Sequence, residues 1–155
     1  MSHRNPYVRD ARTRQAKAQG YPARSVFKLE EIDHRLNLFR GVKTVVDLGA
    51  APGSWSLYAS VKVGTQGHVL AIDLKEIVQA FPPNVQVVQG DALSLSSEVL
   101  SRFAPYDLVL SDMAPNTSGN KVSDQLQSAE LFLRAVEVGK AFGRQGGNFV
   151  GKLFM

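Results

Sequence analysis

The sequence predicts an α/β fold in which helices cover both faces of a mostly parallel β-sheet. Two observations point to it: short β-branched runs alternate with amphipathic segments, and acidic or turn-forming residues follow the ends of the runs. Such alternation is typical of βαβ units, whose parallel strands are buried on both sides. The chain has 155 residues and is 44% hydrophobic, which suits one compact core.

An N-terminal arm and one folded domain divide the chain. Residues 1–20 are basic and poor in large apolar side chains, so we expect a mobile or partly helical arm, followed by a domain over 21–155. Helical spacing of apolar residues predicts a helix from Ser25 that stops before Gly41, and the run Thr44–Leu48 predicts a buried strand. Further helices are expected over 54–61, 96–103 and 124–142, and further strands over 68–73, 85–89, 107–111 and 148–155.

The composition limits the chemistry of the chain. It has no cysteine, and its histidines, His3, His34 and His68, lie far apart, so neither a disulfide nor a metal site is expected. No apolar stretch approaches the roughly 20 residues of a membrane helix. No apolar segment follows the charged N-terminus, so we expect a cytoplasmic protein without a membrane partner.

Positive charge is concentrated near the N-terminus. The net charge is +4 and the isoelectric point is about 9.5. Between residues 4 and 28, Asp10 is the sole acidic residue among these basic ones: Arg4, Arg9, Arg12, Arg14, Lys17, Arg24 and Lys28. A solvated tail and a contact with nucleic-acid phosphates are both compatible with such a run.

The segment 47–55, Asp-Leu-Gly-Ala-Ala-Pro-Gly-Ser-Trp, is a candidate nucleotide-binding turn, because it follows a predicted strand and precedes a predicted helix. Gly49 and Gly53 permit a tight turn and a close approach to a ligand. The helix N-terminus behind them offers free N–H groups to a carboxylate. Ala51 stands where the three-glycine dinucleotide fingerprint has its second glycine, which disfavours NAD.

Two aspartates extend this site to the next strands. Asp73 closes the second predicted strand, about 20 residues after the loop, where a carboxylate accepts hydrogen bonds from the ribose hydroxyls of an adenosine. Asp91 follows the third predicted strand and is placed to bind the adenine amino group. Each aspartate alone is typical of a turn or helix cap. Their order at successive strand ends favours cofactor binding.

Three blocks together strongly resemble the FtsJ-type RNA ribose 2′-O-methyltransferases: residues 21–32, residues 47–55, and Ser-Asp-Met-Ala-Pro-Asn at 111–116. The resemblance runs from about Tyr21 to the last residue and is greatest to the bacterial heat-shock enzymes that act on large-subunit ribosomal RNA. It implies a Rossmann-like, S-adenosylmethionine-dependent methyltransferase whose partner is ribosomal RNA or the large ribosomal subunit.

The resemblance also assigns residues. It places cofactor contacts on Gly53, Trp55, Asp73, Asp91 and Asp112, in addition to Gly49 from the loop analysis. The family's catalytic set is Lys-Asp-Lys-Glu, and its first three members match Lys28, Asp112 and Lys152.

The chemistry explains these residue types. A ribose hydroxyl ionises far above neutral pH, so methyl transfer to it requires a base or stabilisation of the developing alkoxide. Lys152 lies in the otherwise apolar stretch 149–154, where an unpaired charge is costly, which favours a partnered, functional lysine. We hypothesise that Asp112 orients Lys152 and that Lys28 disfavours its protonation. The simpler interpretations are a solvated helix lysine for Lys28 and a strand-end turn for Asp112.

The sequence departs from the family pattern in two places. The family's catalytic glutamate, and the final helix and two strands of its seven-stranded sheet, have no counterpart after Lys152, which leaves 148–155 as an uncovered edge. Ser54 stands where the bacterial enzymes commonly have glycine. We therefore expect cofactor binding to survive better than turnover.

Three functions remain open at this point. The first is the RNA 2′-O-methyltransferase, which we expect to be monomeric when complete. The second is a truncated, catalytically weak or inactive paralogue or fragment that binds cofactor and RNA. The third, a nicotinamide-dependent oxidoreductase, is disfavoured by the glycine loop.

Overall fold

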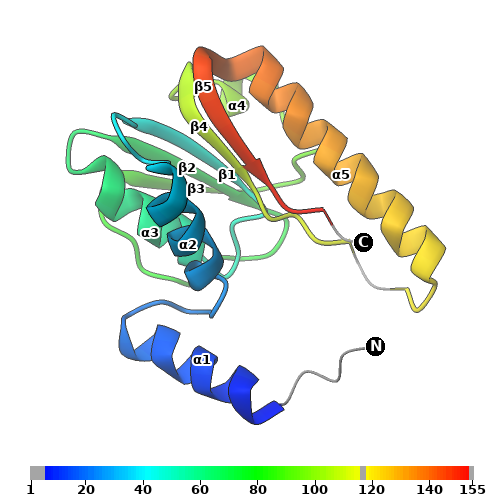
Figure 1. The fold of residues 1–155 in the computed structure, drawn as a ribbon. Helices are drawn as coiled ribbons and strands as arrows, with labels where there is room; N and C mark the ends of the chain where they lie inside the picture. The colour runs from blue at the N-terminus through cyan, green and yellow to red at the C-terminus, as the bar shows by residue number, and fades with distance from the viewer. Residues whose placement is uncertain (1–5, 116–117, 154–155) are drawn as a thin grey trace.

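The computed structural model describes residues 6–115 and 118–153. Its centre is a five-stranded sheet in the order β3-β2-β1-β4-β5 (Figure 1), in which every neighbouring pair is parallel. The strands are β1 (Thr44–Leu48), β2 (His68–Asp73), β3 (Val85–Gln89), β4 (Tyr106–Ser111) and β5 (Gly143–Gly151). The predicted α/β class with a parallel sheet is confirmed.

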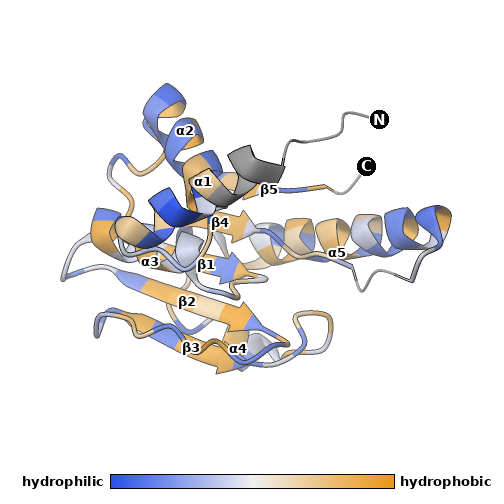
Figure 2. Ribbon diagram, turned by 90° about the horizontal axis from the view of Figure 1, so that it is seen from below, coloured by the Kyte–Doolittle hydropathy of each residue, from blue (hydrophilic) through white to orange (hydrophobic). Residues whose placement is uncertain are grey.

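Helices cover both faces of this sheet. They are α1 (Pro6–Ala18), α2 (Val26–Leu36), α3 (Ser54–Val63), α4 (Ser97–Leu100) and α5 (Lys121–Phe142). One core joins α1, α2 and α3 to the sheet, and a second joins α4 and α5 to its other face. Figure 2 shows β2 and β4 largely in orange, the colour of apolar residues. No helix in the described part of the chain combines the length and apolar character that crossing a bilayer requires.

The alternation of side chains along β1 assigns its residues to the two cores. Val45 packs in the core under α2 and α3, whereas Val46 and Leu48 pack in the core under α4 and α5. Successive side chains of a strand point to opposite faces, so Asp47 shares the face of Val45. Its carboxylate is therefore directed under α3, where Ser56 is its hydrogen-bond partner.

The basic arm is attached to the domain through α1. The side chain of Ala16 is fully buried in the core under α2 and α3. The guanidinium of Arg12 lies 5.7 Å from the centre of the Phe27 ring, and the Tyr21 N–H donates to the Ala16 carbonyl. These contacts hold α1 beside the start of α2.

Some boundaries differ from the predicted ones, and local hydrogen bonds explain the larger shifts. The last helix begins at Lys121 rather than at residue 124, because the Asn120 side chain accepts the Ser123 N–H at its N-terminus. The last strand begins at Gly143 rather than at residue 148, because Gly143 pairs with Tyr106, the first residue of β4. Glycine-rich sequence is a poor strand signal, so only this pairing reveals the early start.

Candidate active site

A cavity of about 350 Å³ opens at the carboxyl ends of β1 to β4. In a parallel sheet, ligands bind outside these ends, where the strand order reverses; here β1 lies between β2 and β4. Four loops and α5 contribute to the lining, which includes Gly49, Ala51, Asp73, Leu74, Gly90, Asp91, Ala92, Asp112, Met113 and Leu131.

The loop between β1 and α3 requires its glycines. Gly49 has φ +77°, and a Cβ there would lie 2.8 Å from the backbone N and Cα of Met113. Gly53 has φ +118°, and a Cβ there would lie 2.8 Å from the Phe81 ring. Larger residues would be strained and would displace neighbouring loops. The loop therefore presents main chain to the cavity.

Asp73 fixes this loop to the end of β2. One carboxylate oxygen accepts the Ala51 N–H at 2.8 Å, and the other accepts the Lys75 N–H at 2.8 Å. A carboxylate has about four acceptor positions, so Asp73 retains capacity for the two hydroxyls of a ribose. Its position fits the predicted role.

Asp91 lies in the loop after β3. One of its oxygens accepts the Leu93 N–H at 2.9 Å, which stabilises the turn. The next residue, Ala92, accepts a hydrogen bond at 2.9 Å from Arg134 of α5, so the loop is also attached to the helix that forms the cavity's far wall.

Asp112 and Lys152 meet at the ends of β4 and β5. The Lys152 ammonium lies 3.5 Å from the Asp112 carboxylate, and the lysine side chain is 66% exposed. The main chain sets this pairing: Asp112 N–H donates to the Leu48 carbonyl and Lys152 N–H donates to the Ser111 carbonyl. Burial raises the pKa of Asp112, the charge of Lys152 opposes the rise, and the charge of Asp73 adds to it.

Lys28 is placed differently. It lies in the first turn of α2, and its ammonium is 3.6 Å from the Glu31 carboxylate, with the two side chains 68% and 48% exposed. The structure thus pairs Lys28 with Glu31 rather than with the Asp112–Lys152 pair. Its effect on the protonation of Lys152 stays a prediction.

Trp55 and Gly53 do not line the cavity. Trp55 is buried in the core under α2, and its indole N–H donates to the Ser25 carbonyl at 2.9 Å. Its contact with cofactor, implied by the resemblance, also stays a prediction. What the structure adds is a link from the glycine loop to the segment that begins α2.

Asp47 is an acidic residue of this region that the sequence analysis left without a role. Its side chain is fully buried, one oxygen accepts the Ser56 hydroxyl at 2.7 Å, and the other has no hydrogen-bond partner. Burial raises its pKa to about 7; the Ser56 hydrogen bond opposes the rise, and the charges of Asp112 and Asp73 add to it. A charged residue inside the apolar run 44–48 was the signal available in the sequence.

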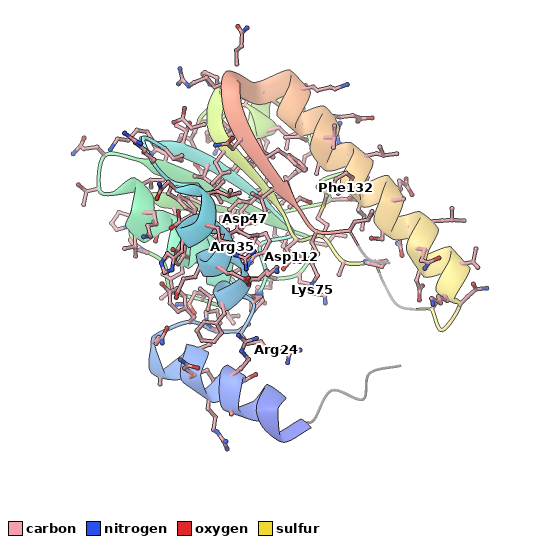
Figure 3. All side chains as sticks on the ribbon, in the orientation of Figure 1. Arg24, Arg35, Asp47, Lys75, Asp112 and Phe132 are labelled. Carbon is pink, nitrogen blue, oxygen red and sulfur yellow. The ribbon has the colours of Figure 1, made fainter. Side chains whose placement is uncertain are left out.

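The residues fit an adenosine cofactor with an amino-acid end. Asp73 and Asp91 offer acceptors to the ribose and adenine, and the glycine loop leaves room that a Cβ would fill. Figure 3 labels Lys75 and Asp112, two residues of the cavity lining. Within residues 6–115 and 118–153, no side chains are grouped as metal ligands would be.

This sheet order, with a glycine loop after the first strand and carboxylates after the next ones, defines a Rossmann-like, nucleotide-binding α/β protein. More particularly, the chain belongs to the FtsJ-like methyltransferase family, whose model matches residues 21–155. S-adenosylmethionine is the cofactor of this family, and hence of this chain.

Individual relatives agree with this assignment. Ribosomal RNA large subunit methyltransferase E of Sorangium cellulosum is 63% identical over 98% of this chain and 72% of its own length. The protein of the same name from Nitratidesulfovibrio vulgaris is 50% identical over 90% of this chain and 70% of its own length. A crystal structure of a ribosomal RNA methyltransferase from Plasmodium falciparum matches with a TM-score of 0.72 and 26% identity, covering 87% of this chain and 79% of that one. The family and cofactor predicted from the sequence are confirmed.

Proposed function

We propose that this methyltransferase acts on the 2′-hydroxyl of a ribose in large-subunit ribosomal RNA. The observation that supports it most is the Asp112–Lys152 pair, in which Asp112 lines the cofactor cavity and the lysine side chain is exposed. The names of the relatives point to the same class of RNA.

Lys152 serves the reacting oxygen in this proposal. S-adenosylmethionine supplies a methyl group bonded to a positively charged sulfur. The Lys152 side chain contacts the hydroxyl oxygen in one of two ways. As a neutral amine it would accept the hydroxyl proton, and as an ammonium it would stabilise the negative charge that develops on the oxygen. Asp112 holds the lysine in place through their 3.5 Å contact. Correct positioning supplies much of the remaining acceleration.

Exposed cations near α1 and α2 support the RNA contact. Lys28 and Arg35 have side chains that are 68% and 76% exposed, on the same helix, and Arg12 lies against Phe27 at the junction with α1. In Figure 3, Arg24 lies between α1 and the start of α2. Such cations bind phosphates and orient RNA without reading its bases.

We further propose that the protein acts as a monomer. Its substrate would be the large ribosomal subunit or its RNA, in the cytoplasm. Binding to RNA should weaken as salt rises, because phosphate contacts release counterions.

Methyl transfer to ribosomal RNA at saturating S-adenosylmethionine tests the assignment. Lys152→Ala should lower kcat by about 100-fold or more, as expected when a group that stabilises developing charge is removed. Its affinity for S-adenosylmethionine should change by less than about threefold, since Lys152 does not line the cavity.

Lys140→Ala is the matched control, because Lys140 is an exposed lysine in the last turn of α5. It should retain the turnover of the unmodified chain. Near-normal turnover in Lys152→Ala would refute the role of the Asp112–Lys152 pair.

A further inference from the structure

Ser54 connects the glycine loop to a segment that is distant in the sequence. It is the first residue of α3, follows Gly53 directly and is 1% exposed. Its hydroxyl oxygen accepts the Ala23 N–H at 2.9 Å, and its O–H group donates to the Ala23 carbonyl at 3.2 Å. One side chain thus binds both polar groups of a residue 31 positions away.

Ala23 belongs to the segment that leads into α2, the helix that the proposed function places against RNA. Arg24 follows it, and Lys28 lies in the first turn of α2. Ser25, at the N-cap position, makes no side-chain capping hydrogen bond. The start of α2 is therefore positioned by contacts with α3, namely the Ser54–Ala23 link and the Trp55 hydrogen bond to the Ser25 carbonyl.

The other side of the glycine loop touches the cofactor site. Gly49 and Ala51 line the cavity, and the Ala51 N–H is bonded to Asp73, the predicted ribose ligand. Between these contacts and Ser54 stand only Pro52 and Gly53. A short, continuous stretch of main chain therefore joins the cavity-lining residues to Ser54.

We propose that Ser54 is a positioning residue that couples the cofactor loop to segment 23–28, so that bound cofactor and bound RNA strengthen each other. This inference rests on the proposed function, because it takes Arg24 and Lys28 to face RNA. Cofactor would contact the glycine loop and RNA would contact segment 23–28. Because the Ser54–Ala23 hydrogen bonds join the two segments, both ligands would stabilise the same arrangement of them. Coupling of this kind is reciprocal: whatever factor cofactor adds to RNA affinity, RNA adds to cofactor affinity.

Ser54→Ala removes the link and leaves the Trp55 hydrogen bond in place. Ser60→Ala is the matched control, because Ser60 is also buried on α3 but its hydroxyl bonds to the Leu57 carbonyl of its own helix. The first measurement is the Kd for a ribosomal RNA fragment, with and without saturating S-adenosylhomocysteine.

In the unmodified chain and in Ser60→Ala, S-adenosylhomocysteine should tighten RNA binding by about fivefold or more, the usual scale of coupling between sites. In Ser54→Ala the factor should fall below about twofold, while the Kd for S-adenosylhomocysteine alone changes by less than about threefold. Equal coupling in Ser54→Ala and the unmodified chain would overturn the inference.

The second measurement does not depend on RNA. Hydrogen exchange of the Ala23 amide should slow when S-adenosylhomocysteine binds the unmodified chain, and should be fast and unresponsive in Ser54→Ala. An Ala23 amide that responds equally in both would also overturn the inference. If the Ala23 amide behaves as expected but no RNA is bound or methylated, the proposed function fails and the Ser54–Ala23 link stands.

Discussion

At the scale of single residues, Asp47 is a fully buried carboxylate in β1, the strand that leads into the glycine loop. Burial raises the pKa of Asp47 to about 7. The pKa of an aspartate in an unfolded chain is about 3.9. Between these values the folded protein binds more protons than the unfolded chain. The free energy of unfolding therefore falls as the pH rises from about 4 to about 7.

Asp47→Asn should remove this pH dependence. Between pH 5 and pH 8 the free energy of unfolding of the unmodified chain should fall by roughly 1 to 3 kcal/mol relative to that of the variant. The reason is that the buried carboxyl of the unmodified chain must ionise over this range, whereas the amide of the variant stays neutral. Urea unfolding at several pH values measures it. Glu130→Gln, which changes an exposed carboxylate of α5, is the control. Parallel pH profiles for Asp47→Asn and the unmodified chain would contradict the assignment.

At the scale of elements, Asp107 joins three strands at the amino edge of the sheet, opposite the cavity. Its carboxylate in β4 accepts the N–H groups of Thr44, the first residue of β1, and of Lys43 just before it. The same carboxylate pairs with Arg144 of β5 at 2.6 Å. Burial alone would raise the pKa of Asp107, but the hydrogen bonds from Lys43 and Arg144 lower it below its ordinary value. The charged form therefore stabilises the fold.

Asp107→Asn should lower the free energy of unfolding at pH 7 by about 1 to 3 kcal/mol, the usual loss when charge-assisted hydrogen bonds are weakened. A lowered pKa gives stability that is present above the unfolded pKa and is lost as the pH falls through the folded one. The difference in free energy of unfolding between Asp107→Asn and the unmodified chain should therefore become smaller below about pH 4. Urea unfolding at pH 7 and pH 3 tests this. An unchanged difference at both values would exclude the electrostatic explanation.

At the scale of the whole molecule, the cofactor site is assembled from loops that follow four strands. The unfolded chain has no such arrangement, so a ligand of this cavity binds the folded state alone. Folding and cofactor binding are consequently linked.

S-adenosylhomocysteine at 100 times its Kd should stabilise the chain by about 2.7 kcal/mol, which corresponds to a rise in Tm of roughly 5 to 10 °C for this size. Thermal unfolding followed by circular dichroism measures the shift. Asp73→Asn should show a much smaller one at the same concentration, because the ribose loses a charged acceptor. A rise in Tm of equal size in Asp73→Asn and the unmodified chain would contradict the role of Asp73 in binding the cofactor.

The sequence by itself determined the fold class, the family and the cofactor loop. These features are local: β-branched runs mark buried strands, and the spacing of Gly49 and Gly53 marks a turn that only small residues permit. Because parallel strands end at one edge, the order of Asp73, Asp91 and Asp112 along the chain also predicted that they would share a cavity.

Only the tertiary structure decided which distant side chains meet. It placed Lys152 against Asp112 and connected Ser54 to Ala23. Such contacts depend on the packing of α2, α3 and the strands against one another, and no periodicity or local spacing encodes them. Burial, which raises the pKa of Asp47, is likewise a property of the assembled core rather than of the residues beside it in the chain.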